Sequence, residues 1–426
     1  MDQFDVIVIG GGPAGMITAG RCAEAGLKVM LIEKMHRPGR KLGITGKGRC
    51  KLTNTAAVED YSEKIQPDGR FMRSSFSMFF NSELISFMNS LGVETETERG
   101  GRVFPKDGKA TDIVRRLESW LRENRVKLLC NTRADKLLLS GNRLSGVEVT
   151  DSISGKKHRY FSESVVLATG GLSYPATGST GDGYRLAASL GHTLNKTYPS
   201  LVPLESRFKH LPLLKGLKLK NVKASVYINN QLSDEAFGEI NFIDKSISGP
   251  IILNLSRTLV KKIIPQNRIY LSIDLKPALD KQKLDARLLR DIDKYGSLEL
   301  KNLLRKLLPG QLVRICINKL GLNQNKAASQ LSSDERSGII EWLKDFRLDI
   351  SGYRPYSEAI ITSGGIEVSE VDQKTFRSKI ADGLYLAGEV LDLDGPTGGY
   401  NLQIAFTTGW CAAEGIKKDR WPEPRS

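Results

Sequence analysis

The chain has 426 residues and a formal net charge of +15, and 40% of its residues are hydrophobic and 26% charged. One hydrophobic core rarely supports a chain of this length, so the length predicts two or three domains. No apolar run approaches the roughly 18 to 20 residues of a membrane helix, and the N-terminal residues lack the features of a secretory signal. We therefore expect a cytoplasmic protein that does not enter a membrane.

Cysteine and histidine usage argues against a metal centre and against a redox-active dithiol. The five cysteines lie far apart and form no C-x-x-C motif, and the four histidines show no spacing typical of metal ligands. We expect no metal in this protein.

The first 34 residues predict a strand, a helix and a second strand. FDVIVIG is a short run rich in β-branched residues, GGPAG interrupts it, MITAGRCAEAG has helical spacing, and LKVMLIEK is a second apolar run. This order is typical of a βαβ unit whose strands are buried in a parallel sheet.

A glycine motif stands between the first predicted strand and the helix. Gly10, Gly12 and Gly15 form G-x-G-x-x-G, and Glu33 ends the next strand about twenty residues later. Such glycines let backbone N–H groups approach a diphosphate at the helix N-terminus, and an acid at this distance accepts ribose hydroxyls. The pattern predicts a dinucleotide site.

The next segment, GRKLGITGKGRCKLTN at Gly39–Asn54, is basic and contains no acidic residue. It is not a P-loop, because Gly48 follows Gly46-Lys47 where Ser or Thr would hold magnesium. The anion that this segment faces must be identified from other parts of the chain.

Residues 125–171 predict a hairpin and then a return to the parallel sheet. RVKLLC, ADKLLL and RLSGVEVTD show strand patterns, with a turn signal around Ser140–Asn142, and ESVVLATGG follows them as a buried strand. The sequence YPATGSTGDGYRLA comes next and has two interpretations. It is either an anion site at a helix start, with Ser179 and Thr180, or a structural loop with Asp182 in an N-cap.

The pattern changes in the middle of the chain. Residues 196–276 contain β-type runs such as KASVYIN and RIYLSIDL, and residues 277–352 show helical spacing, for example in LELKNLLRKLL. We expect these two segments to be inserted domains that interrupt one nucleotide-binding domain, built from residues 1–195 and 353–426. Leu201–Ile350 contains 26 Lys and Arg against 16 Asp and Glu. This excess indicates either a well-solvated surface or a polyanionic partner, RNA above all.

The last segment favours FAD over NAD. GLYLA at Gly383–Ala387 predicts a strand, and an acid and a glycine-rich turn separate it from a helix beginning at about Tyr400. A second, distant strand-turn-helix reaches the same ligand only if that ligand is long, and its helix N-terminus stabilises negative charge on a reduced flavin.

The sequence resembles a known family of flavoproteins over nearly its whole length. The resemblance lies in GGGPAG, GRKLGITGKGRCKLTN, GRVFP, YPATGSTGDGYRLAASLGH, TSGGI and GLYLAGEVLDLDGPTGGYNLQIAF. These motifs are similar to those of the aminoacetone oxidase and BaiN type of FAD-dependent oxidoreductases, within the enzymes that have a glutathione-reductase-like nucleotide domain. The resemblance implies an α/β fold, in which a Rossmann-like FAD-binding domain is interrupted by an inserted β-rich, barrel-like and helical unit.

The resemblance also implies tight, non-covalent FAD binding by particular residues. The implied FAD contacts are Gly10, Gly12, Gly15, Glu33, Lys41, Gly46, Arg49, Gly388, Glu389, Asn401 and Leu402. Neighbours in the same motifs complete the predicted cofactor-binding set: Pro13, Ala14, Lys34, Cys50, Ala168, Thr169 and Gly170. On this interpretation the basic segment follows the FAD diphosphate, with Lys41 and Arg49 as its charge partners.

Two positions depart from the family pattern. Lys51 stands where the family usually has Asn after Arg-Cys, and NFIDKSISGP lacks the histidine that the family has around Ile243–Asp244. The second departure argues against a proton-transfer role at that position.

Cys50, Tyr400 and Asn401 are the candidate catalytic residues. Cys50 is either a small buried residue at a tight turn or a proton donor whose pKa the neighbouring Arg49 and Lys51 lower. Tyr400 and Asn401 are candidate donors to a substrate carbonyl. Phe104 is either a core residue or an exposed ring that stacks on a nucleic-acid base.

The leading prediction is reduction of a polarised C=C bond by hydride from reduced FAD. No second nucleotide motif is evident, so NAD(P)H is expected to donate transiently. The basic insertion favours uridine in ribosomal RNA as substrate, giving dihydrouridine. The alternatives are a small-molecule flavoenzyme, either an enone or bile-acid reductase or an amine oxidase, and a non-catalytic flavin-containing RNA-binding protein.

Overall fold

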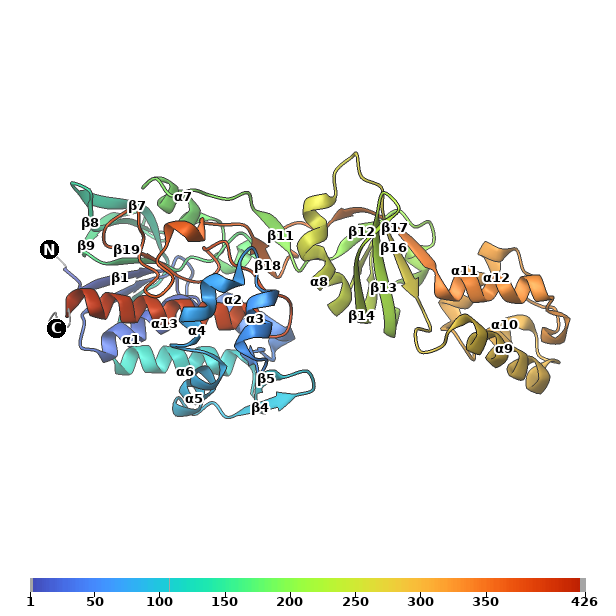
Figure 1. Ribbon diagram of the computed structural model, residues 1–426. Helices are drawn as coiled ribbons and strands as arrows, with labels where there is room; N and C mark the ends of the chain where they lie inside the picture. The colour runs from blue at the N-terminus through green and yellow to red at the C-terminus, as the bar shows by residue number, and fades with distance from the viewer. Residues whose placement is uncertain (1–2, 107, 422–426) are drawn as a thin grey trace. The chain divides into compact units, whose positions relative to one another are not determined.

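The computed structural model describes residues 3–106 and 108–421. The chain forms two compact units, Met1–Ser200 with Tyr356–Ser426, and Leu201–Pro355, here called the nucleotide unit and the inserted unit (Figure 1). The finer division of the insertion near residue 276 stays a prediction.

A five-stranded parallel sheet forms the centre of the nucleotide unit. Its order is β19-β10-β1-β2-β6, and every neighbouring pair is parallel. The strands are short and mostly apolar, as expected for a sheet covered on both faces: β1 (Val6–Ile9), β2 (Val29–Ile32), β6 (Lys127–Leu129), β10 (Val165–Leu167) and β19 (Leu384–Leu386).

Three long helices pack side by side in this unit: α1 (Pro13–Glu24), α6 (Ala110–Glu123) and α13 (Tyr400–Arg420). The contact between α1 and α13 is close because Gly409 brings no side chain to it. A Cβ on Gly409 would lie 2.4 Å from the Ala14 carbonyl oxygen. Thr18 Oγ1 donates to the Gly409 carbonyl across the same contact, at 2.8 Å.

The other elements of the nucleotide unit surround this centre. An antiparallel sheet contains β7 (Thr132–Ser140), β8 (Arg143–Asp151) and β9 (Lys157–Phe161). A second contains β3 (Thr53–Asn54), β4 (Thr95–Glu98) and β5 (Arg102–Pro105), and β11 (Tyr198–Ser200) pairs with β18 (Ile361–Ser363). The shorter helices are α2 (Arg40–Ile44), α3 (Val58–Lys64), α4 (Arg73–Phe76), α5 (Asn81–Ser90) and α7 (Asp182–Ala188).

The inserted unit contains a closed barrel with the strand order β12-β15-β14-β13-β16-β17. Apolar side chains alternate into its interior, for example Val222, Ala224 and Val226 on one strand. The strands are β12 (Leu204–Ser206), β13 (Lys218–Ile228), β14 (Gln231–Ile243), β15 (Ser246–Ser248), β16 (Ile269–Asp274) and β17 (Phe346–Tyr353).

Five helices complete the inserted unit. α8 (Pro250–Leu259) lies within the segment predicted to be β-rich, where Pro250 occupies the first helical turn and the apolar residues have helical spacing. The other four are α9 (Lys281–Tyr295), α10 (Leu300–Leu304), α11 (Gly310–Leu320) and α12 (Ser333–Lys344).

The predicted fold class is confirmed: a Rossmann-like α/β domain is interrupted by a barrel and helices. Among residues 3–106 and 108–421, no helix combines the length and the apolar character that crossing a bilayer requires.

Candidate functional site

Three glycine-containing segments that are distant in sequence meet at the carboxyl ends of the parallel strands. The Gly10–Gly15 loop follows β1, Ala168–Gly170 follows β10, and Gly388 follows β19. A Cβ on Gly10 would lie 2.4 Å from the Ala168 carbonyl oxygen, and a Cβ on Gly388 would lie 2.9 Å from Ala14 Cβ. Ligands of open α/β sheets bind at this edge.

The three glycines of the G-x-G-x-x-G motif, Gly10, Gly12 and Gly15, do not share one role. Gly10 has φ of 107°, and a Cβ on Gly15 would lie 1.9 Å from the Gly10 carbonyl oxygen, so both are required by the loop itself. Gly12 has nothing within 4 Å of the position of a Cβ. Space for a ligand is therefore open beside Gly12.

The first turn of α1 faces this space with its N–H groups unpaired by any side chain. Gly12 is the N-cap, it provides no side-chain cap, and no acidic residue lies in the first turn. N–H groups of a first turn have no carbonyl partner within their own helix, and the helix dipole favours an anion there. Pro13 has no N–H, so the N–H groups of Ala14 and Gly15 are the ones that fit a diphosphate.

Glu33 fixes the shape of the glycine loop. Its carboxylate accepts N–H bonds from Gly11 and Met35, each at 2.8 Å. Burial raises the pKa of Glu33, and the two N–H bonds act in the opposite direction. A carboxylate has about four acceptor positions, so Glu33 retains the capacity to accept a ribose hydroxyl.

Lys34, the next residue, bonds both the loop that precedes α7 and the first residue of α7. Its ammonium bonds Asp182 at 2.7 Å and also Thr180. Gly181 is the N-cap of α7, so Asp182 is not its cap but lies in its first turn as the partner of Lys34. Gly170, which has φ of 71°, follows Thr169 and turns the chain after β10 toward this loop.

A polar network joins α2 to the end of β19. Lys41 Nζ lies 2.6 Å from a Glu389 carboxylate oxygen and donates to Ser173 Oγ at 2.6 Å. Glu389 also accepts from Ser173 Oγ and from the Thr362 N–H, each at 2.8 Å. The structure thus brings two predicted cofactor residues, Lys41 and Glu389, into one ion pair, which holds the ammonium in place.

The N-terminus of α13 is a second uncapped helix start. Its N-cap Gly399 has φ of 111°, gives no side-chain cap, and no acid lies in the first turn. A Cβ on Gly399 would lie 2.3 Å from the Thr53 backbone, so this turn packs directly on β3. Leu402 lies in the same first turn.

Tyr400 and Asn401 have unequal freedom to act on a substrate. The Asn401 amide bonds the backbone of Gly395 at 2.8 and 2.7 Å, so it holds the turn before α13. Tyr400 is buried, its ring lies 4.3 Å from that of Tyr61, and its hydroxyl accepts from Lys64 Nζ at 3.2 Å. The hydroxyl proton of Tyr400 is available for another acceptor.

Of the two interpretations of Cys50, the structure supports the small buried residue at a tight turn. Cys50 is fully buried, and burial raises the pKa of its thiol to about 12. The flanking cations do not offset burial, because Arg49 lies beside Glu98 at 2.6 Å and its own side chain is more than half exposed. Cys50 has φ of 51° and occupies the tight turn that follows Gly46 and Lys47.

Phe104 is a core residue. It is 2% exposed in β5, and the Arg49 guanidinium lies over its ring at 4.3 Å. The alternative of an exposed ring that stacks on a nucleic-acid base is therefore wrong. Arg49, which was predicted to contact the cofactor, lies beside Glu98 and over the ring of Phe104 in the structure.

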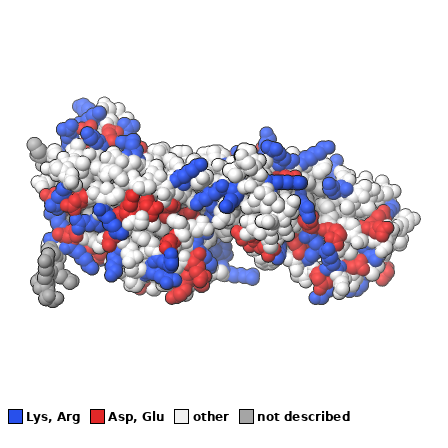
Figure 2. Space-filling model, turned by 45° about the horizontal axis from the view of Figure 1, so that its top comes forward, with Lys and Arg blue, Asp and Glu red and all other residues white. Residues whose placement is uncertain are grey.

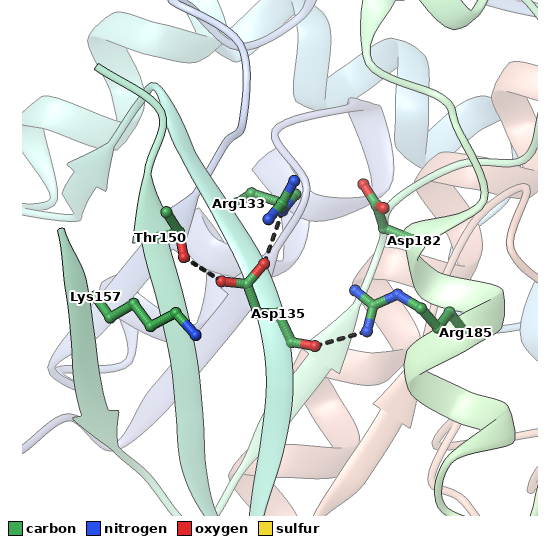
Figure 3. A pocket seen from close by; sticks show the side chains of 6 residues that line it. All are labelled: Arg133, Asp135, Thr150, Lys157, Asp182 and Arg185. Carbon is green, nitrogen blue, oxygen red and sulfur yellow. Dashed lines mark hydrogen bonds and ion pairs between the residues drawn. The ribbon is translucent and has the colours of Figure 1, made fainter. Parts of the chain in front are cut away.

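A charged pocket of about 370 Å³ lies between β7, β8, β9 and α7 (Figure 3). Its two carboxylates are already engaged, Asp135 by Arg133 at 2.7 Å and by Thr150, and Asp182 by Lys34. Arg185 donates to the Asp135 carbonyl oxygen at 2.6 Å and joins α7 to β7. These bonds give the pocket lining a structural role.

Sequence reasoning missed several residues of the site. Thr362 stands within the quoted motif TSGGI, which gave a signal, whereas Ser173, Tyr61 and Lys64 lie outside every quoted motif and gave none. Within the described part of the chain, no group of three or more His, Cys, Asp or Glu is placed to hold a metal.

The parallel sheet, the open glycine loop and the second helix start define an FAD-dependent oxidoreductase with a Rossmann-type domain. The chain belongs to the family described as HI0933-like protein Rossmann domain, whose family model matches residues 4–415. The resemblance to this type of flavoprotein is thereby confirmed.

Two relatives match over almost their whole length. A 3-dehydro-bile acid delta(4,6)-reductase of Clostridium scindens is 32% identical, over 95% of this chain and 97% of the relative. A ribosomal RNA dihydrouridine synthase of Escherichia coli is 30% identical, over 98% of both chains.

Solved structures show the same fold at low identity. The 3-ketosteroid delta1-dehydrogenase of Sterolibacterium denitrificans has a TM-score of 0.54 and 14% identity, covering 98% of this chain and 100% of its own.

Proposed function

We propose that this protein reduces a polarised C=C bond with FAD as its cofactor and NAD(P)H as the electron donor, and that its substrate is uridine in ribosomal RNA. The product is dihydrouridine. The single observation that carries the choice of substrate is the excess of basic residues in Leu201–Ile350, where 26 Lys and Arg stand against 16 Asp and Glu.

The proposed cofactor site uses both uncapped helix starts. The N–H groups of Ala14 and Gly15 would bind the diphosphate at the open space beside Gly12. Glu33 would accept the ribose hydroxyls, and the turn of Gly398 and Gly399 would face the ring system. When bound, FAD supplies the hydride chemistry.

The protein's own residues would position the substrate and give a proton. The carbonyl conjugated to the double bond needs donors, and backbone N–H groups at the start of α13 are preorganised for that task. Tyr400, whose hydroxyl accepts from Lys64, is the proposed proton donor. Asn401 is proposed to act indirectly, by holding the Gly395 turn.

Both relatives are consistent with this reaction type. The name of one describes a reductase of bile-acid double bonds, and the name of the other describes formation of dihydrouridine. Uracil has a C5–C6 double bond conjugated to a carbonyl, so both reactions add hydride and a proton to a polarised C=C bond. A phosphate backbone gives a reason for the basic insertion, and a steroid gives none.

A steroid-like enone is the second candidate substrate. The observation that favours it is the 32% identity to the bile-acid reductase, against 30% to the RNA enzyme.

The test compares ribosomal RNA from cells with and without the gene, using mass spectrometry of nucleosides. Loss of dihydrouridine on deletion, restored by the wild-type gene and in vitro by purified yellow protein with NAD(P)H, supports the proposal. Unchanged dihydrouridine together with turnover of a 4-ene-3-ketosteroid by the purified protein would replace it with the second candidate.

A further inference from the structure

The positive charge of the inserted unit is unevenly neutralised. In the helical part several cations have an acidic partner: Lys281 with Glu341, Arg287 with Asp291, Lys326 with Glu335 and Arg336 with Asp285. Figure 2 shows acidic and basic side chains interspersed over the face of the molecule that it draws. Other cations of the helical part, among them Arg290, Arg314 and Lys319, are exposed without an acidic partner among the described residues, and a second group of such cations lies at one end of the barrel.

Cations from three segments lie at one end of the barrel: the loop between β12 and β13, the start of β13, and the turn between β14 and β15. The loop Arg207–Leu217 joins β12 to β13, and these strands flank the β15-β14 hairpin in the barrel order. Glu205 pairs with Ser246, Ile243 with Ser246, and Lys218 with Asn241. Both ends of the loop therefore lie beside the Asp244–Lys245 turn.

The backbone confirms that the end of the loop runs along the hairpin. The Gly216 N–H donates to the Phe242 carbonyl at 2.9 Å, and the Phe242 N–H donates back to Leu217 at 2.9 Å. Lys215 Nζ lies 3.9 Å from Asp244. We call this set of cations the basic rim: Arg207, Lys209, Lys215, Lys218, Lys220 and Lys245.

Five of the six cations of the basic rim have no ion-pair partner within residues 3–106 and 108–421. Lys215 has only the distant Asp244, and Arg207, Lys209, Lys218, Lys220 and Lys245 have none, although all are exposed. Unpaired cations keep their charge for an external anion such as a phosphate.

We propose that the basic rim binds the phosphate backbone of the RNA substrate. This inference rests on the proposed function and adds the surface that holds the RNA. Exposed apolar side chains at the rim are confined to Leu213 and Ile243, at 42% and 37% exposure, so the surface is suited to a charged backbone rather than to an apolar protein face. Lys218 and Lys220 lie on β13, and the other four cations lie in the loop and the turn at the same end of the barrel.

The test measures binding of a ribosomal RNA fragment at several salt concentrations. The rim variant carries Arg207→Gln, Lys209→Gln and Lys218→Gln. The matched control carries Arg290→Gln, Arg314→Gln and Lys319→Gln, which remove the same charge from exposed cations of the helical part. Flavin absorbance and circular dichroism establish that both variants are folded and loaded.

We expect the rim variant to bind the fragment at least about tenfold more weakly near physiological salt. The slope of log K against log salt should decrease in magnitude by about 2, because each of the three lost phosphate contacts contributes roughly 0.7 to 0.9. The control should stay within about threefold of wild type. In turnover, KM for RNA should rise in the rim variant while kcat is retained.

Equal losses in the two variants would overturn the rim assignment, because net charge alone would then explain binding. Unchanged RNA binding by the rim variant would also overturn it and leave the proposed function intact. A rim variant that loses only binding to anionic lipid vesicles would assign the surface to a membrane instead. If wild-type protein neither binds nor modifies ribosomal RNA, the proposed function itself fails.

Discussion

The glycines of the first loop show why identical residues in one motif need not have one role. A methyl group on Gly15 collides with the Gly10 carbonyl, whereas a methyl group on Gly12 meets only open space. Gly15 therefore serves the fold, and the open space beside Gly12 is where we propose that the ligand binds.

This difference predicts opposite phenotypes for two alanine variants. Gly15→Ala should destabilise the protein by about 2 kcal/mol, although alanine normally favours a helix by about 1 kcal/mol, because the Cβ would lie 1.9 Å from the carbonyl oxygen. Gly12→Ala should leave the stability of the flavin-free protein within about 0.5 kcal/mol of wild type and weaken FAD binding about tenfold. Thermal unfolding and flavin titration measure both, and full FAD affinity in Gly12→Ala would contradict the placement of the ligand.

Cys50 is predicted to be chemically silent in the folded protein. Burial raises the pKa of its thiol from an ordinary value of 9.0 to about 12, so at pH 8 to 9 iodoacetamide should leave Cys50 unlabelled until the protein is unfolded. Cys50→Ala should retain flavin and at least about half of the activity. Labelling of native Cys50 at pH 8, or loss of activity with flavin retained in Cys50→Ala, would restore a catalytic role.

The same shift has a consequence for stability at high pH. A thiol whose pKa is raised in the folded state stabilises that state below the unfolded pKa, and the contribution is lost as the pH rises from about 9 to 12. The free energy of unfolding should therefore fall more steeply over this range in wild type than in Cys50→Ala.

Residues within glycine motifs could be predicted from the sequence, and residues in contact through the fold could not. Gly10, Gly12, Gly15 and Glu33 are recognisable because their spacing expresses a local turn and a fixed helix length. The Ser173 and Thr362 partners of Glu389 depend on pairing between segments almost 190 residues apart. The sequence left two interpretations of Cys50 open because its sequence neighbours are cations, and in the structure burial raises the pKa of its thiol.

At the scale of elements, the ion pair of Lys41 and Glu389 joins α2 to the segment after β19. Both side chains are 20% exposed, and Glu389 also accepts from Ser173 and from the Thr362 backbone. A short helix of five residues has little stability of its own. We infer that this network holds α2 and its following basic turn against the sheet edge.

A double-mutant cycle measures that role. Lys41→Met and Glu389→Gln should each lower the free energy of unfolding by about 1 to 3 kcal/mol, and the double variant should lose less than the sum, with a coupling energy of about 1 to 2 kcal/mol. The comparable exposed pair of Lys281 and Glu341, at 58% and 57% exposure, should show less than about 0.5 kcal/mol. Additive losses at Lys41 and Glu389 would show that the pair does not connect the two elements.

Elements with strong local patterns were predictable, and those set by tertiary context were not. The parallel strands and the helix after Gly399 follow from apolar runs and glycine turns. α8 was not predicted, although Pro250 at its start and apolar residues at helical spacing are local signals of a helix. Closure of the six strands into a barrel depends on the distant pairing of β12 with β17, which no local pattern contains.

At the scale of the whole molecule, the two units have separate interiors. The hydrophobic cluster of the nucleotide unit contains residues from Phe4 to Ala187 and from Ile366 to Ile416, and no residue of the inserted unit belongs to it. The two connections lie next to each other, since Tyr198 pairs with Ser363 in one unit and Leu204 pairs with Tyr353 in the other. An insertion whose two ends are adjacent leaves the interrupted domain's sheet intact.

This arrangement predicts that the nucleotide unit folds and binds FAD without the insertion. Replacement of Leu201–Pro355 by a short Gly-Ser linker joins Ser200 to Tyr356, close to the β11–β18 pair in which Ser200 lies opposite Ile361. The shortened protein should be yellow, unfold cooperatively and retain an FAD affinity within about tenfold of wild type, because the Gly10–Gly15 loop, Glu33 and α13 all lie in the retained unit.

The shortened protein should lose salt-dependent binding to ribosomal RNA, since the removed residues carry the basic rim. Absorbance, calorimetry and RNA titration separate the two functions, and a shortened protein that folds but is colourless would mean that the inserted unit contributes to the cofactor site.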